Sequence, residues 1–213
     1  GAAGADVDDA DATRYLTFDF FGRRQHVWDR HTGRHRVSGE TQEGETFIVL
    51  HDVDDRGKGE GKVYLNGDEA TGERRAEMLE SAYAMWINDT YWLIMPYKLQ
   101  DPGVTLTYAG EETVGGTTYD KVMLSFEGVG LTPGDRYWAW INRDTGLMDR
   151  WAYHLESMEP DAEPVAWEWL GWKRYGDVML APTRKQVEGE ERQVSLGPIE
   201  APRQVPDATF TKP

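Results

Sequence analysis

Apolar and aromatic residues alternate with polar ones along much of this chain, and this period of two constrains the fold more than any other feature. In residues 136–141, Trp138 and Trp140 would share one face of a strand, while Tyr137 and Ala139 would lie on the other. Such alternation is typical of half-buried β-strands, whose successive side chains point to opposite faces. The same pattern occurs in residues 15–21, 121–126, 147–155 and 165–171.

Short turn sequences separate these runs. Residues 29–33 and 142–146 each end in Thr-Gly and can form a type I turn followed by a left-handed glycine, a common hairpin connection. Asn66 and Gly67 mark a further turn. The sequence therefore predicts a mainly β (α+β) fold, with about ten strands in a strongly curved antiparallel sheet that forms a half-barrel.

One segment departs from the period of two. Over residues 71–89 the apolar residues are spaced by three and four, and they are Ala76, Leu79, Tyr83 and Trp86. This spacing predicts an amphipathic helix that covers the sheet as a lid, with Thr71 as its N-cap. Residues 91–96 are apolar on both sides and are expected to be a second covering segment, buried under the helix. Pro96 favours a strand end or an irregular stretch there.

The ends of the chain differ in composition from its middle. Residues 1–12 are small and acidic and predict a disordered leader, whereas residues 198–213 are proline-rich and predict an extended tail with Phe210 as an anchor. Residues 13–197 are then expected to form a single domain. A small, acidic start of this kind favours an exported protein, periplasmic or anchored to the outer membrane as a lipoprotein, with its signal segment absent from this chain.

Charge and composition exclude several classes of function. With 38 acidic and 23 basic residues the net charge is −15, which repels nucleic acids and anionic lipid headgroups. No apolar run is long enough to span a membrane. The absence of cysteine excludes a thiol nucleophile, a cysteine-ligated metal and any disulfide.

Two groups of residues invite a metal site. Four residues fall at positions one, three, six and nine of a calcium-binding loop: Asp52, Asp54, Gly57 and Glu60. Arg56 and Val63 stand where ligands are required, so a solvated turn explains this loop better. His26, His31 and His35 lie within ten residues, with His51 further along, but a hairpin would set His35 across from Trp28 as a stacked pair without any metal. No metal or cofactor is therefore predicted.

Catalytic motifs are absent from the sequence: it holds no nucleophile elbow, P-loop or dinucleotide fingerprint. Among the carboxylates, Glu168 alternates away from Trp167 and Trp169 and is expected to face solvent. Asp149 shares a face with Trp151 and could act in a cleft, or could close the hairpin after Gly146.

The inner face of ten strands is wider than one helix can cover. It must be filled by bulky side chains, by a second covering segment or by a ligand, and both ordinary core packing and an apolar cavity fit this condition. The candidate ligand-binding residues are apolar or aromatic positions of the sheet and its lid: Phe18, Phe20, Leu79, Tyr83, Trp86, Leu93, Met95, Trp138, Trp140, Trp151, Tyr153, Trp167 and Trp169.

Two stretches resemble a known family. Residues 92–103, WLIMPYKLQDPG, resemble the segment after the helix in uncharacterised bacterial exported proteins related to the LolA/LolB lipoprotein-carrier superfamily. The strand 137–141, the turn 142–146 and the strand from Leu147 resemble that superfamily's strand, Asp-x-x-Thr-Gly turn and strand, with Asn142 in place of the Asp. The resemblance implies a half-barrel closed by helices over an apolar cavity, which holds lipid or lipoprotein acyl chains in the carrier members.

The first hypothesis is therefore a binding protein and not an enzyme: an exported carrier or sensor for a lipid or acyl chain. The alternative is a carbohydrate-binding module that stacks sugars on exposed tryptophans. A hydrolase that uses paired carboxylates in the cleft is a third hypothesis.

Overall fold

The computed structural model describes residues 13–57, 60–127, 132–189 and 191–213. The fold is mainly β, with one curved antiparallel sheet of thirteen strands that does not close, and with one main helix. The hydrogen-bonded strand order is β6-β5-β4-β3-β2-β1-β15-β14-β11-β10-β9-β8-β7. The predicted fold class is confirmed, with more strands than the ten expected. The predicted leader, residues 1–12, lies outside the described residues.

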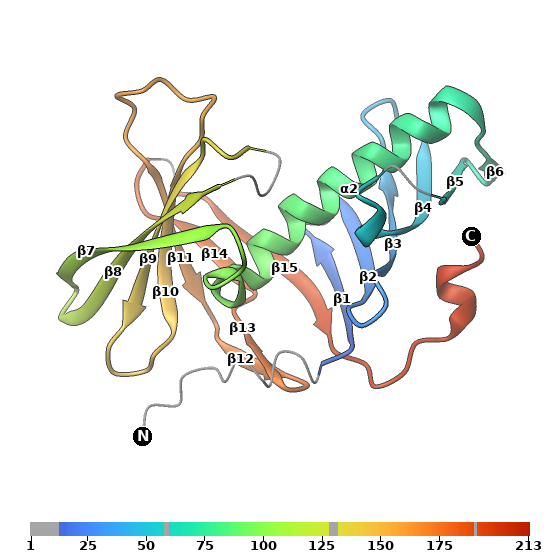
Figure 1. The fold of residues 1–213 in the computed structure, drawn as a ribbon. Coiled ribbons are helices and arrows are strands. Elements are labelled where there is room, and N and C mark those ends of the chain that lie inside the picture. Colours follow the sequence, from blue (N-terminus) through green and yellow to red (C-terminus); the bar gives the residue numbers. More distant parts are fainter. Residues whose placement is uncertain (1–12, 58–59, 128–131, 190) are drawn as a thin grey trace. The chain divides into compact units, whose positions relative to one another are not determined.

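The chain divides into two compact units (Figure 1). The N-terminal unit comprises residues 13–92, Tyr175–Val178 and Ser195–Pro213. Its strands are β1 (Tyr15–Phe20), β2 (Arg24–Asp29), β3 (Arg34–Glu40), β4 (Thr46–Asp52), β5 (Lys62–Leu65), β6 (Asp68–Glu69) and most of β15 (Gln193–Glu200). A short 3-10 helix, η1 (Val53–Asp55), follows β4.

The central unit comprises Leu93–Arg174 and Met179–Val194. Its sheet strands are β7 (Val104–Val114), β8 (Thr117–Phe126), β9 (Arg136–Asn142), β10 (Met148–His154), β11 (Val165–Leu170) and β14 (Thr183–Gln186). Strands β12 (Lys173–Tyr175) and β13 (Val178–Leu180) form a separate pair.

The two predicted Thr-Gly turns form hairpins with the expected backbone. Gly33 and Gly146 have φ of +73° and +72°, in the left-handed region that a residue with a side chain rarely adopts. In the second turn the Asn142 side chain accepts hydrogen bonds from the backbone N–H of Asp144 and Thr145, at 2.9 and 3.3 Å. Asn142 therefore supplies the acceptor that an Asp would supply at this position.

The main helix, α2, runs over Gly72–Ile94 and continues into a 3-10 helix, η2 (Met95–Lys98). The prediction that residues 91–96 form a strand end or an irregular stretch is wrong, because Tyr91 to Ile94 are the last turn of α2. Pro96 is compatible with this course since it occupies the first turn of η2, where a missing N–H breaks no hydrogen bond.

Within the N-terminal unit α2 lies across the sheet and packs directly on it (Figure 1). The core between them combines residues of β3, β4 and β5 with one stripe of the helix: Val37, Phe47, Val49, Val63, Met78, Leu79 and Ala82. A Cβ added at Gly61 would come within 2.8 Å of the Leu50 backbone oxygen and 2.4 Å of Leu79 Cδ2, so a glycine is needed where the helix approaches the chain before β5. Side chains fill this interface.

The C-terminal segment is held against the N-terminal unit by Phe210. A 3-10 helix, η3 (Asp207–Phe210), follows β15 and buries Phe210 to 8% exposure. The Phe210 ring stacks on Tyr15 with centroids 6.4 Å apart, and the Arg34 guanidinium lies 4.6 Å from its centre. Phe210 therefore fixes this segment to β1 and β3.

Candidate functional site

One face of the sheet in the central unit is apolar across five strands. Residues paired directly across neighbouring strands share a face, and the register pairs Leu106 with Leu124, Leu124 with Tyr137, and Tyr137 with Tyr153. This surface is called the apolar face below. Its residues are Val104, Leu106, Tyr108, Val122, Leu124, Phe126, Tyr137, Ala139, Trp151, Tyr153, Val165, Trp167 and Trp169.

The aromatic residues of the apolar face pack against one another. Tyr137 stacks on Trp151 with centroids 5.4 Å apart, and Trp151 meets Trp169 edge to face at 5.8 Å. The buried Arg184 guanidinium also lies over the Trp169 ring, 3.4 Å from its centre. Offset and edge-to-face contacts of this kind add to the free energy gained by burial. The end of the face at β10 and β11 is therefore a rigid aromatic platform.

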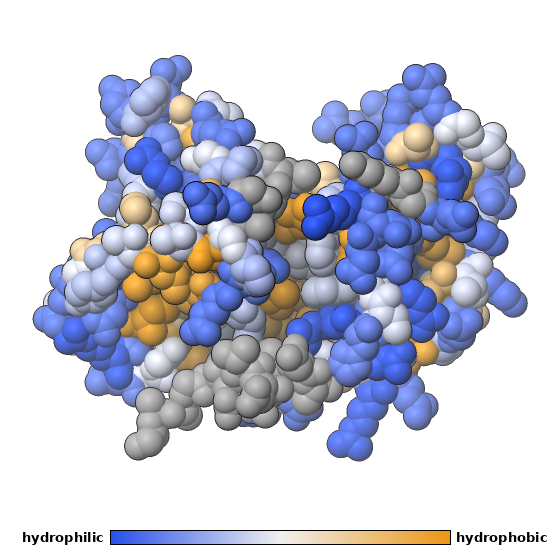
Figure 2. Space-filling model, viewed as in Figure 1, coloured by the Kyte–Doolittle hydropathy of each residue, from blue (hydrophilic) through white to orange (hydrophobic). Residues whose placement is uncertain are grey.

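Exposure rises along the apolar face from this platform towards β7. Trp151 and Trp169 are each 1% exposed, whereas Leu106 is 41% and Tyr108 is 60% exposed. On the intervening strand Val122 and Phe126 are half-buried, and Leu124 between them is fully buried. Figure 2 shows hydrophobic residues gathered on the visible side of the unit that holds β7 to β11. The apolar face is thus closed at one end and open to solvent at β7.

Two predicted tryptophans do not belong to this face. The register pairs Trp138 with Ala152 and Trp140 with Arg150, opposite to the side that carries Trp151. The prediction that all five tryptophans share the inner face is wrong for these two, because Ala139, their neighbour in β9, is the residue that faces Trp151. Alternation alone predicts which residues of one strand share a face, but it does not fix how two strands are paired.

The Trp140 ring is enclosed by charged groups. Lys121 and Arg150 lie 4.4 and 5.1 Å from its centre, and its Nε1 donates to Glu112 at 3.0 Å. The residue is 5% exposed. Since both cations contact the ring, it offers no open face for a sugar to stack on, and the carbohydrate hypothesis gains no support here.

The predicted residues outside the central sheet lie in packed surroundings. Phe18 stacks on His26 at 4.5 Å, Phe20 contacts Phe21 at 4.2 Å, and Trp86 contacts Trp28 and Tyr83 at 5.4 and 5.8 Å. Leu79, Leu93 and Met95 complete this group, and they are 3%, 0% and 0% exposed. The structure gives these side chains packing partners, and their ligand-binding roles stay predictions.

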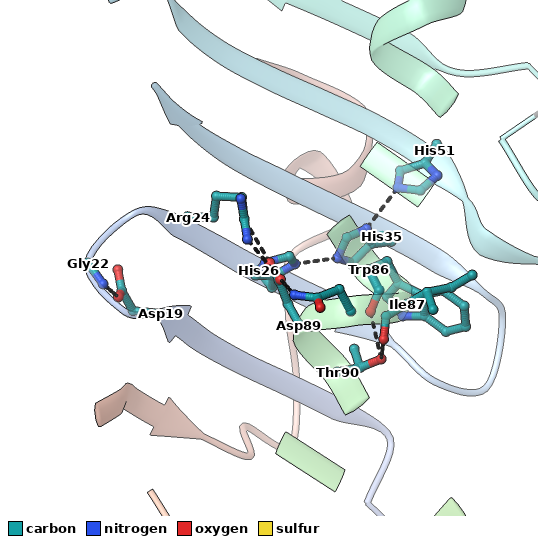
Figure 3. Close-up of polar contacts among 11 residues, drawn as sticks. Asp19, Gly22, Arg24, His26, His35, His51, Trp86, Ile87, Asp89 and Thr90 are labelled. Carbon is teal, nitrogen blue, oxygen red and sulfur yellow. Dashed lines mark hydrogen bonds and ion pairs between the residues drawn. The ribbon is translucent and has the colours of Figure 1, made fainter. Parts of the chain in front are cut away.

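Sequence reasoning missed a buried polar chain in the N-terminal unit (Figure 3). Asp89 of α2 forms two hydrogen bonds with Arg24 of β2, at 2.7 and 2.8 Å, and a third with His26 Nε2 at 2.9 Å. His26 Nδ1 lies 3.0 Å from His35 Nε2, and His35 Nδ1 lies 2.8 Å from His51 Nε2. We call Asp89, His26, His35 and His51 the histidine chain.

Burial shapes the protonation of the histidine chain. Burial, reinforced by the charges of His26 and His51, holds the pKa of His35 well below its usual value. Burial likewise lowers the pKa of His51 to about 4, although the charge of Asp52 opposes this shift. The two rings are therefore neutral near pH 7.

The sequence carried part of the signal for this chain. His35 does pair with Trp28 across the predicted hairpin, but its ring binds His26 and His51 instead of stacking on Trp28 alone. His51 is the other direct partner of His35, in β4. Asp89 could not have been found, because only the placement of the helix on the sheet brings it to His26.

The acidic loop after β4 forms a capped turn. The Asp52 carboxylate accepts a hydrogen bond from the backbone N–H of Asp54 at 2.9 Å, which caps η1. Beside it lies a small hollow without room for a water molecule, lined by His51, Asp52, Asp55, Gly57, Glu60 and Leu79. Within the described residues, no three histidine or carboxylate side chains converge as metal ligands. Lys58 and Gly59 of this loop lie outside those residues.

The two carboxylates weighed as catalytic candidates have other partners. Asp149 accepts a hydrogen bond from Asn142 Nδ2 at 2.7 Å, so it joins the two strands of its hairpin. Glu168 pairs across the sheet with Arg150 and Lys185, on the face away from Trp167, as predicted. No helix among the described residues has the length and hydrophobicity needed to cross a membrane.

Comparisons with known proteins place the fold. No family model matches the sequence, and a search of curated proteins finds no similar sequence. A LolA superfamily protein from Nitrosomonas europaea matches in structure with a TM-score of 0.50, at 10% identity, over 97% of this chain and 96% of that chain. A DUF1329 family protein from Desulfovibrio piger aligns over 96% and 92%, at 11% identity and a TM-score of 0.45. The predicted resemblance to the LolA superfamily is confirmed at the level of the fold.

Proposed function

We propose that the protein binds a lipid or acyl chain as a carrier or sensor, and that the chain lies on the apolar face of the central unit. The observation that carries this proposal is the open end of that face. Leu106 and Tyr108 are 41% and 60% exposed, yet they continue a surface whose other end is almost completely buried. An apolar guest that covers β7 and β8 would extend the buried region outwards.

The binding would be driven by removal of apolar surface from water. Each methylene transferred out of water contributes about 0.8 kcal/mol, so an acyl chain needs no specific polar contact for affinity. Leu106, Val122 and Phe126 would contact the guest. The packed rings of Trp151 and Trp169 would leave it no room at β10 and β11, so the guest would stay over β7 and β8. Trp167 and Tyr153, also predicted as ligand-binding residues, belong to the same platform.

The LolA-like fold supports this proposal, since the superfamily resemblance implies carriage of lipid or lipoprotein acyl chains. Such carriage takes place outside the cytoplasm, so the proposal includes an exported protein, periplasmic or attached to the outer membrane. No catalytic step is part of the proposal.

The experiment is lipid extraction of the purified protein, followed by titration of the delipidated protein with oleate under intrinsic fluorescence. Because Trp151 and Trp169 lie on the same face as the proposed guest, we expect a saturable change in emission and a lipid in the extract. A protein that purifies empty and gives only a linear, unsaturable response would contradict the proposal.

A further inference from the structure

The histidine chain joins the helix to three strands in one unbroken line. Asp89 belongs to α2, His26 to β2, His35 to β3 and His51 to β4 (Figure 3). Asp89 is 0% exposed, His26 and His35 are each 1% exposed, and His51 is 8% exposed. The line therefore runs from the buried helix contact to a residue next to the hollow after β4.

The carboxylate at one end fixes the direction of every hydrogen bond in the chain. Asp89 is paired with Arg24 and can only accept, so His26 Nε2 must donate to it. In a neutral ring the other nitrogen then accepts. His26 Nδ1 accepts from His35 Nε2–H, and His35 Nδ1 accepts from His51 Nε2–H.

This direction leaves a single nitrogen without a partner. His51 Nδ1 is buried and has no hydrogen-bond partner, and the assignment above makes it a bare lone pair. His51 is one of the residues that line the hollow, together with the acidic residues Asp52, Asp55 and Glu60. The charge of the neighbouring Asp52 favours a proton on this acceptor, while burial opposes it and lowers the pKa of His51.

The groups that face the chain come from every element around it. Arg24 of β2 is the permanent cation at the Asp89 end, and Phe18 of β1 covers the His26 ring. At the other end Asp52 of β4 acts on His51 by its charge, and Asp55 of η1 and Glu60 of the following loop line the same hollow. The carboxylates at the His51 end therefore take no part in the ion pair between Arg24 and Asp89 that holds α2.

We propose that the histidine chain is a proton-operated latch, which holds α2 on strands β2 to β4 when neutral and releases it when a proton enters at His51 Nδ1. A solvent proton forms the new N–H bond at His51 Nδ1. The proton on His51 Nε2 then moves to His35 Nδ1, and the one on His35 Nε2 moves to His26 Nδ1. The chain gains one proton and no electrons are transferred.

The added proton weakens the attachment of α2 to the strands because its positive charge comes to rest on the buried ring of His26. His26, now an imidazolium, and Arg24 both face the single carboxylate of Asp89, which leaves one uncompensated positive charge in a buried space. An unpaired buried charge is strongly disfavoured. Separation of this part of α2 from the strands lets water reach the charge, so acid favours the released state.

The lowered pKa values agree with this direction. Burial keeps the pKa of His35 and His51 below the usual histidine value in the latched state, so protons bind preferentially to a state in which the rings are hydrated. The half of α2 that contains Met78, Leu79 and Ala82 is held by apolar side chains, which carry no ionisable group and therefore pack equally well at either pH. Release is therefore expected in the half of α2 that contains Asp89 and not in the half that contains these residues.

The first test is hydrogen–deuterium exchange of the full chain at about pH 7.5 and about pH 5, corrected for the intrinsic effect of pH. We expect peptides covering residues 83–92 to lose protection by at least about tenfold at the lower pH, because the pKa of His51 rises from about 4 towards its usual value on release. Peptides covering residues 73–82 should change by less than about twofold. No loss at residues 83–92, or an equal loss along all of α2, would overturn the proposal.

A matched pair of variants isolates the entry atom. In His51→Gln the side-chain amide can still donate to His35 Nδ1 but does not titrate, so the acid loss of protection should be smaller than in the unmodified protein, and the remainder comes from His35. The control His31→Gln changes an exposed histidine in the turn before β3, and it should behave like the unmodified protein. The same acid loss in His51→Gln as in the control would contradict entry at His51.

A second measurement needs no variant. The chain has five histidines, so imidazole nitrogen NMR of the histidine-labelled protein can resolve each ring. At about pH 7.5 we expect His26, His35 and His51 all to carry the proton on Nε2, with His51 Nδ1 as a free acceptor. A proton on His51 Nδ1 at that pH would overturn the proposal even if every variant failed to fold.

Discussion

His26 donates its Nε2 proton to Asp89 Oδ2 across 2.9 Å, although the two residues are 63 positions apart in the sequence. The contact ties β2 to α2, and neither side chain is exposed. Arg24 binds the same carboxylate through two nitrogens. The polar anchor of the helix is therefore separate from its apolar core around Leu79, and the two can be tested independently.

Removal of the charge on Asp89 should destabilise the fold strongly. In Asp89→Asn the buried ends of Arg24 and His26 lose their carboxylate, and such a loss typically costs about 3–5 kcal/mol of unfolding free energy. Urea denaturation at about pH 7.5 measures it. The control is Asp101→Asn, which breaks a half-exposed pair with Lys98 and should cost at most about 1 kcal/mol. Equal losses in the two variants would show that the Asp89 anchor adds no more stability than the half-exposed pair of Asp101 and Lys98.

The stability of the protein should fall with acid through His51. Burial lowers the pKa of this residue in the folded state to about 4, whereas the unfolded state binds a proton near pH 6.5. Neutral His51 therefore contributes its full share of folding stability above about pH 6.5. This share, roughly 3 kcal/mol, is lost progressively as the pH drops from about 6.5 to about 4. The difference in unfolding free energy between the unmodified protein and His51→Gln, followed by urea denaturation across this range, should show that slope. A pH-independent difference would contradict the assignment.

Truncation of the same residue type should have unequal effects at buried and exposed sites. Leu79→Ala removes a side chain that is 3% exposed within the core of the N-terminal unit, and we expect a loss of about 2–5 kcal/mol. Leu106→Ala changes a residue that is 41% exposed, and its cost should stay within about 0.5 kcal/mol. Thermal or urea unfolding compares them. A costly Leu106→Ala would mean that the β7 end of the apolar face is more tightly packed than its exposure indicates.

The fold followed from the sequence where local periodicity determined it. The alternation around Trp138, the Thr-Gly turns and the three-to-four spacing around Leu79 each describe a single element, so they were readable without a structure. The prediction for residues 91–96 is wrong because it treats proline as a residue that excludes a helix, whereas Pro96 only begins a new turn. Proline is harmless in the first turn, where its nitrogen has no intrahelical acceptor.

The sites depended on pairings between elements, and these were harder to predict. The split of the tryptophans between two faces depends on the register of β9 against β10, which places Ala139 and not Trp138 opposite Trp151. The histidine chain depends on how α2 is seated on the sheet. Neither relationship leaves a local periodic pattern, so sequence reasoning named the right residue types and missed how they meet.

The most direct test of lipid binding at the apolar face compares two leucines of similar exposure on opposite faces of the same sheet. Leu106 is 41% exposed on the apolar face, and Leu170 is 37% exposed in β11, where it alternates with Trp169 and points to the other side. Equilibrium dialysis of the delipidated protein against radiolabelled oleate should show at least about tenfold weaker binding for Leu106→Asp, since a buried carboxylate costs well over 1.4 kcal/mol. Leu170→Asp should bind like the unmodified protein. Equal affinities in both variants, or a loss confined to Leu170→Asp, would contradict an acyl-chain site on the apolar face.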